Sequence, residues 1–390
     1  CDAVSLAVIK VADLVSNLFY ADRAWDYGHA VLPVEVRQSA VETLATITCN
    51  GNPALRREFI VSGSGSSLAS TLYGNVMALY NALLDTNIQY VGLGVGADAL
   101  LDGSSVFVGV DAPLDHRSKL ASKSISTLVV PAFTSSITLP YTIHYPPAAP
   151  PLPALVLSRS VVADIFLARI TSWSDPAIAA LNPVLAPWLP NSTICVCIYS
   201  QPNGMTSVFT EALAAFSPDW AYLYGSTSYM PPGQWPGETD ATACILRADD
   251  ATSVARAIAG STSAIGFVTR SVAAASQLDM VSLINRAGNT VRAAAATVAA
   301  AADDSANDEP EVPHLPLVHS IVDRPAADAW PISTFTYFAI DGDAPADGRC
   351  AERRVFAEFL VWMLTSPDAW RLTASLSFSP LSNTTAFPAL

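Results

Sequence analysis

Residues 59–75 (FIVSGSGSSLASTLYGN) join a short apolar run to a glycine-rich turn and then to apolar residues at helical spacing. The apolar run 59–61 predicts a buried strand, and Ser66 and Ser67 are suited to cap the helix that follows. Glycines let a backbone approach a ligand closely, and the free N–H groups of a helix's first turn attract anions. Ordinary strand-to-helix turns have the same pattern, so this segment alone leaves both interpretations open.

Two later segments repeat this arrangement. Residues 87–91 predict a strand before the glycine-rich turn 92–98, and residues 193–199 predict a strand before the turn 200–207, which also leads into helical spacing. A further apolar strand ends at Asp111, at the strand end where open α/β sheets place ligand contacts. Capping of the next turn remains an alternative role for this carboxylate. Alternating strands and helices predict an α/β fold.

The overall charge excludes some function classes. Acidic residues outnumber basic ones by 34 to 20, giving a net charge of −14, which argues against a nucleic-acid-binding surface but not against a small anionic ligand. No apolar stretch reaches the ~18 residues of a transmembrane segment, so none is expected. The six cysteines suggest no zinc ligand set, and no cofactor or metal is indicated; disulfides are possible, with their pairing left open.

Taken together, seven segments resemble the phosphate-binding receptor of bacterial phosphate ABC importers, a class of periplasmic binding protein. The resemblance covers about residues 57–385. It implies an α/β, type II periplasmic binding protein-like fold, with two lobes joined by crossing strands and a ligand in the cleft between them. The matching segments are GSGSSLASTLY (63–73), YVGLGVG (90–96), VGVDAPL (108–114), residues 155–183, NGMTSVFT (203–210), SAIGFV (263–268) and AWPISTFTYFAI (329–340).

The same resemblance implies how the chain is divided. Residues 57–138 with 320–390 are expected to form lobe one, and residues 139–270 lobe two. Residues 271–319 would connect the lobes and include an Ala-rich, then acidic stretch that we expect to be mobile. Residues 1–56 would be an accessory, helical extension.

In that family, backbone N–H groups, hydroxyls, one arginine and one aspartate hold the phosphate. The aspartate is retained as Asp111, but the arginine position is Tyr199, and Val95 and Met205 stand where the family has hydroxyls. The expected ligand-binding residues are therefore Ser66, Ser67, Leu68, Val95, Gly96, Asp111, Tyr199, Asn203, Gly204, Met205 and Thr206.

These departures predict weaker phosphate binding than the family norm. The lost charge-assisted and neutral hydrogen bonds together are worth ~3–6 kcal/mol. Tyr199 is a candidate phenolic donor, and Thr206 a candidate replacement for the missing threonine. Arg117, Arg159 or Arg169 would have to supply any positive charge from elsewhere in the chain.

Two hypotheses of binding remain. In the first, the protein is an extracytoplasmic solute-binding protein (secreted, periplasmic or on the cell surface) that captures phosphate or a related small oxyanion and has a membrane transporter or receptor as its partner. In the second, the cleft has changed or lost its ligand and the fold acts as an extracellular recognition or scaffold domain. A triad of His116 and Asp111 with Ser66 or Ser67 can be imagined, but an enzyme is not expected, because the sequence has no GxSxG nucleophile elbow and indicates neither a nucleophile nor metals.

Overall fold

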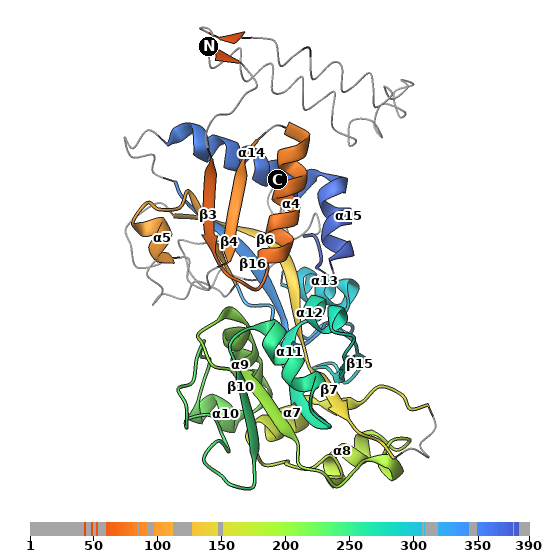
Figure 1. Ribbon diagram of the computed structural model, residues 1–390. Helices are drawn as coiled ribbons and strands as arrows, with labels where there is room; N and C mark the ends of the chain where they lie inside the picture. The colour runs from red at the N-terminus through yellow and green to blue at the C-terminus, as the bar shows by residue number, and fades with distance from the viewer. Residues whose placement is uncertain are drawn as a thin grey trace, which may run out of the picture.

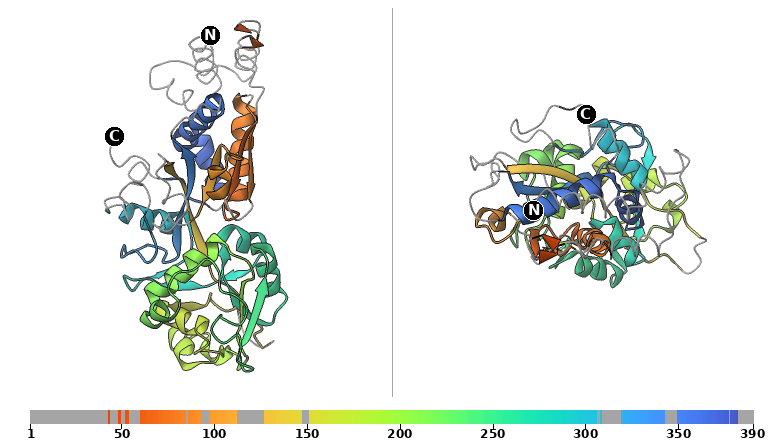
Figure 2. Two further views of the ribbon diagram at one scale, coloured as in Figure 1. Left: turned by 90° about the vertical axis from the view of Figure 1, so that its left-hand side faces the viewer. Right: turned by 90° about the horizontal axis from the view of Figure 1, so that it is seen from above.

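The computed structural model describes residues 43, 48–49, 52–53, 60–84, 86–92, 97–111, 127–146, 151–305, 308, 319–342, 349–376 and 378–381. Two sheets form the cores of two lobes, which lie one above the other in Figure 1 and in the left view of Figure 2. The predicted two-lobed α/β fold is confirmed. Val95 and Gly96 lie outside the described residues, as does nearly all of the expected N-terminal extension.

Lobe one is built on the larger sheet. Its β3, β4 and β5 run parallel, and β16 pairs antiparallel with both β5 and β6. The described strands, in spatial order, are β12 (Val268–Thr269), β6 (Thr127–Thr138), β16 (Ser333–Asp341), β5 (Phe107–Val110), β3 (Val61–Gly65) and β4 (Ile88–Gly92). The helices of this lobe are α4 (Ser70–Leu84), α5 (Ala97–Leu101), α14 (Cys350–Thr365) and α15 (Pro367–Ser375).

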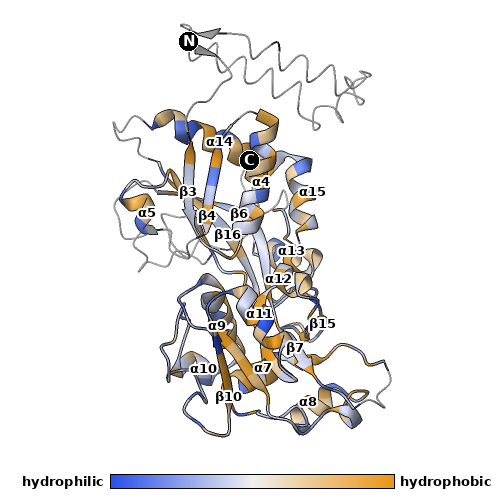
Figure 3. Ribbon diagram, in the orientation of Figure 1, coloured by the Kyte–Doolittle hydropathy of each residue, from blue (hydrophilic) through white to orange (hydrophobic). Residues whose placement is uncertain are grey.

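Lobe two is built on a second, mixed sheet. Its described strands, in spatial order, are β10 (Cys244–Ala248), β9 (Cys195–Tyr199), β11 (Ser263–Gly266), β7 (Pro140–Ile143) and β13 (Asp279–Met280). Around it lie α7 (Arg159–Phe166), α8 (Pro176–Leu181), the short 3-10 helix η1 (Ala186–Trp188), α9 (Gly204–Phe216), α10 (Pro218–Leu223) and α11 (Ala251–Ala259). In Figure 3, α7 is mostly apolar, as expected of a helix that buries one face against the lobe.

Smaller elements complete the described chain. They are the pair β1 (Thr48–Cys49) and β2 (Asn52–Pro53), the sheet of β15 (Thr290–Val291), β14 (Ser282–Ile284) and β8 (Val156–Ser158), and the helices α12 (Arg270–Ala275) and α13 (Ala295–Asp304). Both of these helices lie at the level where the lobes meet (Figure 1). The residue boundaries expected for the lobes and their connection stay a prediction.

Two antiparallel segments carry the chain between the lobes. β6 of lobe one continues through Leu139 into β7 of lobe two, and β11 returns through Phe267 into β12. Both linking residues are fully buried. Next to Pro131, β6 contains a bulge opposite the step from Thr336 to Tyr337. These buried crossing segments therefore connect the two lobes.

The structure corrects the first predicted strand. The strand begins at Val61, after the half-exposed Ile60, and continues through the glycines to Gly65. A side chain at Gly63 would collide with the Phe107 ring, and Gly65 has a φ of 131°, which favours glycine. The glycines therefore allow close packing inside the sheet, and the turn lies after them, in residues 66–69.

A disulfide joins neighbouring strands of lobe two. Cys195 of β9 bonds Cys244 of β10, and the two residues are register partners in the parallel pair. Cys197, two residues along β9, is a buried free thiol. Within the described residues, no helix is long and apolar enough to cross a membrane.

Candidate functional site

Asp111 lies where the two lobes meet. It follows β5 and is 6% exposed, and the Ser66 hydroxyl donates a hydrogen bond to its Oδ2. Gly204, at the start of α9 in lobe two, lies directly against it: a Cβ added there would come within 2.7 Å of the Asp111 Cβ. The expected aspartate and the expected glycine are thus in contact across the interface between the lobes.

Burial dominates the electrostatics of this carboxyl group. Removal from water raises the pKa of Asp111 to about 7, and the Ser66 hydrogen bond opposes that rise. Its Oδ1 is buried without a hydrogen-bond partner among the described residues. A buried acceptor of this kind is costly unless a donor reaches it. The geometry therefore provides one strong, unused acceptor at the junction of the lobes.

The segment before α4 is held firmly around Ser66. The Ser66 N–H donates to the Gly109 carbonyl (2.9 Å), and the Tyr90 hydroxyl donates to the Ser66 carbonyl (2.8 Å). The Leu68 N–H donates to Ser66 Oγ (3.0 Å), so Ser66 caps the turn that precedes α4 and not, as expected, the helix itself, which begins at Ser70. Ser67, which is exposed, faces the cleft instead.

Asn203 organises the start of α9. Its Oδ1 accepts hydrogen bonds from the Thr206 N–H (2.8 Å) and the Thr206 hydroxyl (3.2 Å). The Tyr199 hydroxyl donates to the Met205 sulfur at 3.2 Å. In this conformation, the two hydroxyls expected to replace lost ligand contacts are both engaged inside lobe two.

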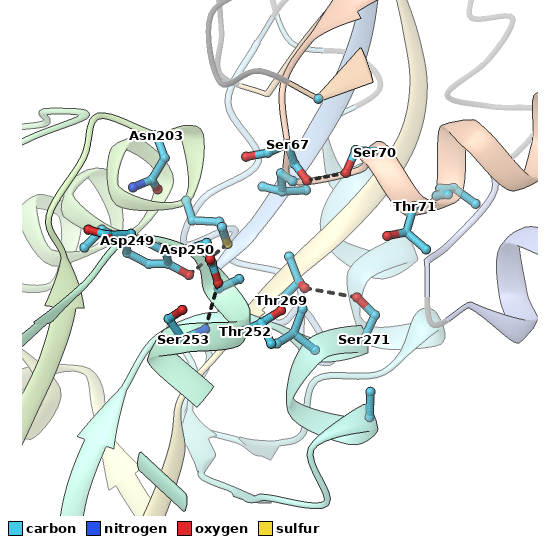
Figure 4. Close-up of a pocket in the computed structure, with 18 of the residues that line it drawn as sticks. Ser67, Ser70, Thr71, Asn203, Asp249, Asp250, Thr252, Ser253, Thr269 and Ser271 are labelled. Atoms are coloured by element: carbon cyan, nitrogen blue, oxygen red, sulfur yellow. Dashed lines mark hydrogen bonds between the residues drawn. The ribbon is translucent and has the colours of Figure 1, made fainter. Parts of the chain in front are cut away.

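Beside this junction, a cleft of about 900 Å³ opens between the lobes. Figure 4 shows hydroxyl side chains facing it from both lobes and the carboxylates of Asp249 and Asp250 from lobe two. Lobe one contributes Ser67, Leu68, Ser70 and Thr71; Asn203, Asp249, Asp250, Thr252, Ser253 and Arg256 of lobe two face them, with Thr269 and Ser271 from the junction. The starts of α4, α9 and α11 therefore share one polar space.

Sequence reasoning missed the α11 wall of this cleft. Asp250 caps α11 by accepting a hydrogen bond from the Ser253 N–H (2.7 Å), and the Ser200 hydroxyl donates to Asp249. The signal was present: an apolar strand, two aspartates and then Thr252 and Ser253. This turn has no glycine, so it lacks the feature that marks the three glycine-containing turns as candidate anion sites.

Two of the arginines expected to reach the site, Arg159 and Arg169, do not line the cleft. Arg159 pairs with Asp323 (2.5 Å), and Arg169 pairs with Asp164 and Asp219. Arg117 lies outside the described residues, as does His116. Within the described part of the chain, Arg256 is the cationic residue that lines the cleft.

The structure brings most of the expected ligand-binding residues to one place. Those that line the cleft are Ser67, Leu68, Tyr199, Asn203 and Met205. Ser66, Asp111, Gly204 and Thr206 adjoin it at the junction of the lobes. Whether these residues bind a ligand is not decided by their placement and stays a prediction.

Comparisons with known proteins agree with this architecture. The chain is 29% identical over 310 residues to the phosphate-binding protein PstS of Xylella fastidiosa, covering 77% of this chain and 76% of that protein. It is 27% identical over 290 residues to the phosphate-binding protein PstS of Methanocaldococcus jannaschii, covering 72% of each. A putative phosphate ABC transporter substrate-binding protein with bound phosphate from Clostridium perfringens has the same fold, with a TM-score of 0.54 and 15% identity over 83% of this chain and 100% of that one.

A family model described as a PBP superfamily domain matches residues 38–367. That match spans most of the chain and includes both lobes and the crossing strands between them. The chain therefore belongs to the PBP superfamily.

Proposed function

We propose that this protein captures phosphate, or a related small oxyanion, in the cleft between its two lobes. The observation that carries the proposal is Asp111 Oδ1, a carboxylate oxygen that is buried at the lobe junction without a partner among the described residues. Hydrogen phosphate bears a protonated oxygen that can donate to such an acceptor. Sulfate is fully ionised near neutral pH and has no proton to give, so the same oxygen would repel it.

The walls of the cleft supply the complementary donors. The starts of α4, α9 and α11 all face it, and the partial positive charge of a helix N-terminus stabilises an anion. Hydroxyls of Ser67, Ser70 and Thr252 line the same space. As ligand-binding residues we propose Ser66, Ser67, Leu68, Val95, Gly96, Asp111, Tyr199, Asn203, Gly204, Met205 and Thr206.

The relatives support the same function. Two curated proteins that align over most of this chain are named phosphate-binding proteins. The disulfide between Cys195 and Cys244 supports an extracytoplasmic location, because disulfides persist in oxidising compartments. We infer a binding protein and not an enzyme, with a membrane transporter or receptor as the partner that receives the ligand.

Thermal denaturation with added anions tests this proposal. A ligand that binds the folded state alone raises its stability by RT ln(1 + [L]/Kd), about 2.7 kcal/mol at a hundredfold excess over Kd. We expect millimolar phosphate to raise the melting temperature and sulfate at equal ionic strength to leave it unchanged. Absence of any shift with phosphate, checked by calorimetric titration, would overturn the proposal and leave the hypothesis of a changed or lost ligand.

A further inference from the structure

A bound oxyanion in this cleft needs a counter-charge that the carboxyl end of β9 does not supply. Tyr199 stands there, its hydroxyl directed at the Met205 sulfur and its ring packed on Phe267 (5.2 Å between centroids). Burial raises the pKa of the Tyr199 hydroxyl, so it remains a neutral phenol. Asp249 and Asp250 add two exposed negative charges to the wall of the cleft. An anion entering the cleft therefore meets repulsion from these carboxylates, and a nearby cation would help the helix dipoles to balance it.

Most described arginines are committed to carboxylates elsewhere. The pairs are Arg159 with Asp323, Arg169 with Asp164 and Asp219, Arg247 with Glu238, Arg324 with Asp304 and Asp308, Arg349 with Glu352, Arg354 with Glu358, and Arg371 with Asp368. Arg256 is different: its side chain is exposed, lines the cleft and has no ion pair within the described residues. Its charge is available to a ligand.

The position of Arg256 on α11 directs it to the ligand space. Thr252, Ser253 and Arg256 all line the cleft, and Thr252 lies one helical turn before Arg256. Across the cleft, Ser67 and Ser70 approach from the start of α4, as Figure 4 shows. The guanidinium group carries five N–H donors in a planar fork that matches the oxygens of phosphate, and its stem is flexible enough to follow an ion.

We propose that Arg256 supplies the positive charge for the bound oxyanion, so that the cation comes from α11 and not from the end of β9. This inference rests on the proposed function, since it concerns the same ligand. In it, Arg256 and the hydroxyls of Thr252 and Ser67 bind the oxygens that face the open side of the cleft, while Asp111 receives the protonated oxygen at the junction. The positive charge of Arg256 then partly compensates the negative charges of Asp249 and Asp250 on the same wall of the cleft.

Calorimetric titration of inorganic phosphate into Arg256→Gln tests the inference. We expect phosphate to bind about 10- to 100-fold more weakly than in the wild type, because the variant loses one charge-assisted hydrogen-bonding group. Arg256→Lys should recover part of that loss, because it restores the charge without the planar fork. Arg169→Gln is the matched control: it removes the same charge from lobe two at a surface position outside the cleft, and it should bind phosphate within twofold of the wild type.

The outcomes separate this inference from the function on which it rests. Equal phosphate affinity of the wild type and Arg256→Gln would overturn the role of Arg256 and leave phosphate capture standing. Equal weakening of phosphate binding in Arg256→Gln and Arg169→Gln would also overturn it, because the loss would then come from the change in net charge and not from a direct contact with the ligand. A wild type that binds no phosphate would overturn both. Far-UV circular dichroism should show that each variant is folded, as expected for exposed side chains.

Discussion

At the Asp111 end of the cleft the two lobes touch around a buried carboxyl group, whereas at the α11 end the walls stand apart and charged side chains are exposed. Burial makes charge expensive at the first end, so recognition there depends on which group carries a proton. At the second end, solvent and salt screen the charges, and each contributes modestly. One cleft thus combines a selective, buried contact with an adjustable, exposed one.

The buried end should dominate the pH dependence of stability. The pKa of Asp111 is raised from 3.8 to about 7, so the folded state holds this proton more tightly than the unfolded state. Its contribution is therefore complete below about pH 4 and is lost as the pH rises through about 7. One pKa unit corresponds to about 1.4 kcal/mol, so roughly 4 kcal/mol of the free energy of unfolding depends on this group.

Denaturant unfolding of the wild type and Asp111→Asn, in buffers free of phosphate, measures this effect. Asparagine keeps an acceptor for the Ser66 hydroxyl but does not titrate. We expect the difference in unfolding free energy between the two proteins to shift in favour of the variant between pH 4 and pH 7. Other carboxyl groups with a raised pKa, such as that of Asp323, contribute equally to both proteins and so cancel in that difference. A constant difference across this range would show that Asp111 is not effectively buried in solution.

The contact between the lobes gives the next largest effect. In Gly204→Ala the added methyl group would lie 2.7 Å from the Asp111 Cβ and 3.0 Å from its Cγ, so the lobes must separate at this point. Overpacking of this kind costs about 1–3 kcal/mol. If phosphate binds the conformation in which the lobes touch, its affinity should fall about 10- to 100-fold, as calorimetric titration would show.

Gly74→Ala is the matched control for that substitution. Gly74 lies on α4, and an added Cβ there has no neighbour within 4 Å, so the change should stabilise the helix by about 0.5–1 kcal/mol without altering phosphate affinity. Unchanged phosphate binding by Gly204→Ala would mean that the ligand does not require the contact at Asp111.

Local patterns predicted the buried end well. They place Asp111 at the end of a strand and the polar turn around Asn203 at a helix start, and both lie there in the structure, whereas Ser66 caps the turn before α4 and not the helix itself. These features depend on a few neighbouring residues, which is what sequence patterns record. The contact of Asp111 with Gly204 was not predictable in this way, because it depends on how two lobes built from distant segments meet.

The exposed end was hidden for a different reason. The sequence offers Arg117, Arg159 and Arg169 as cations that could reach the site from elsewhere in the chain. Arg159 and Arg169, however, are paired with carboxylates that only the fold brings near them. Arg256 belongs to none of the sequence motifs described above. It is one residue on an amphipathic helix, and its place in the cleft follows from the orientation of α11. Likewise, the sequence makes the Tyr199 hydroxyl a candidate donor to the ligand, but in the folded protein it donates to the Met205 sulfur.

The smallest predicted effect is a gain in phosphate affinity, opposite to the loss expected for Arg256→Gln. Asp249→Asn removes one negative charge from the exposed wall, while its amide oxygen still accepts the Ser200 hydroxyl. We expect phosphate affinity at low salt to rise about two- to fivefold, which corresponds to roughly 0.4–1 kcal/mol. Because exposed charges are screened, the gain should disappear near 0.5 M NaCl, whereas the effect of Gly204→Ala should persist.

Asp219→Asn, on the surface of α10, changes the net charge equally and should leave affinity unchanged. A gain that persists at high salt would show that Asp249 is desolvated when phosphate binds, and the contrast between the two ends of the cleft would then not hold.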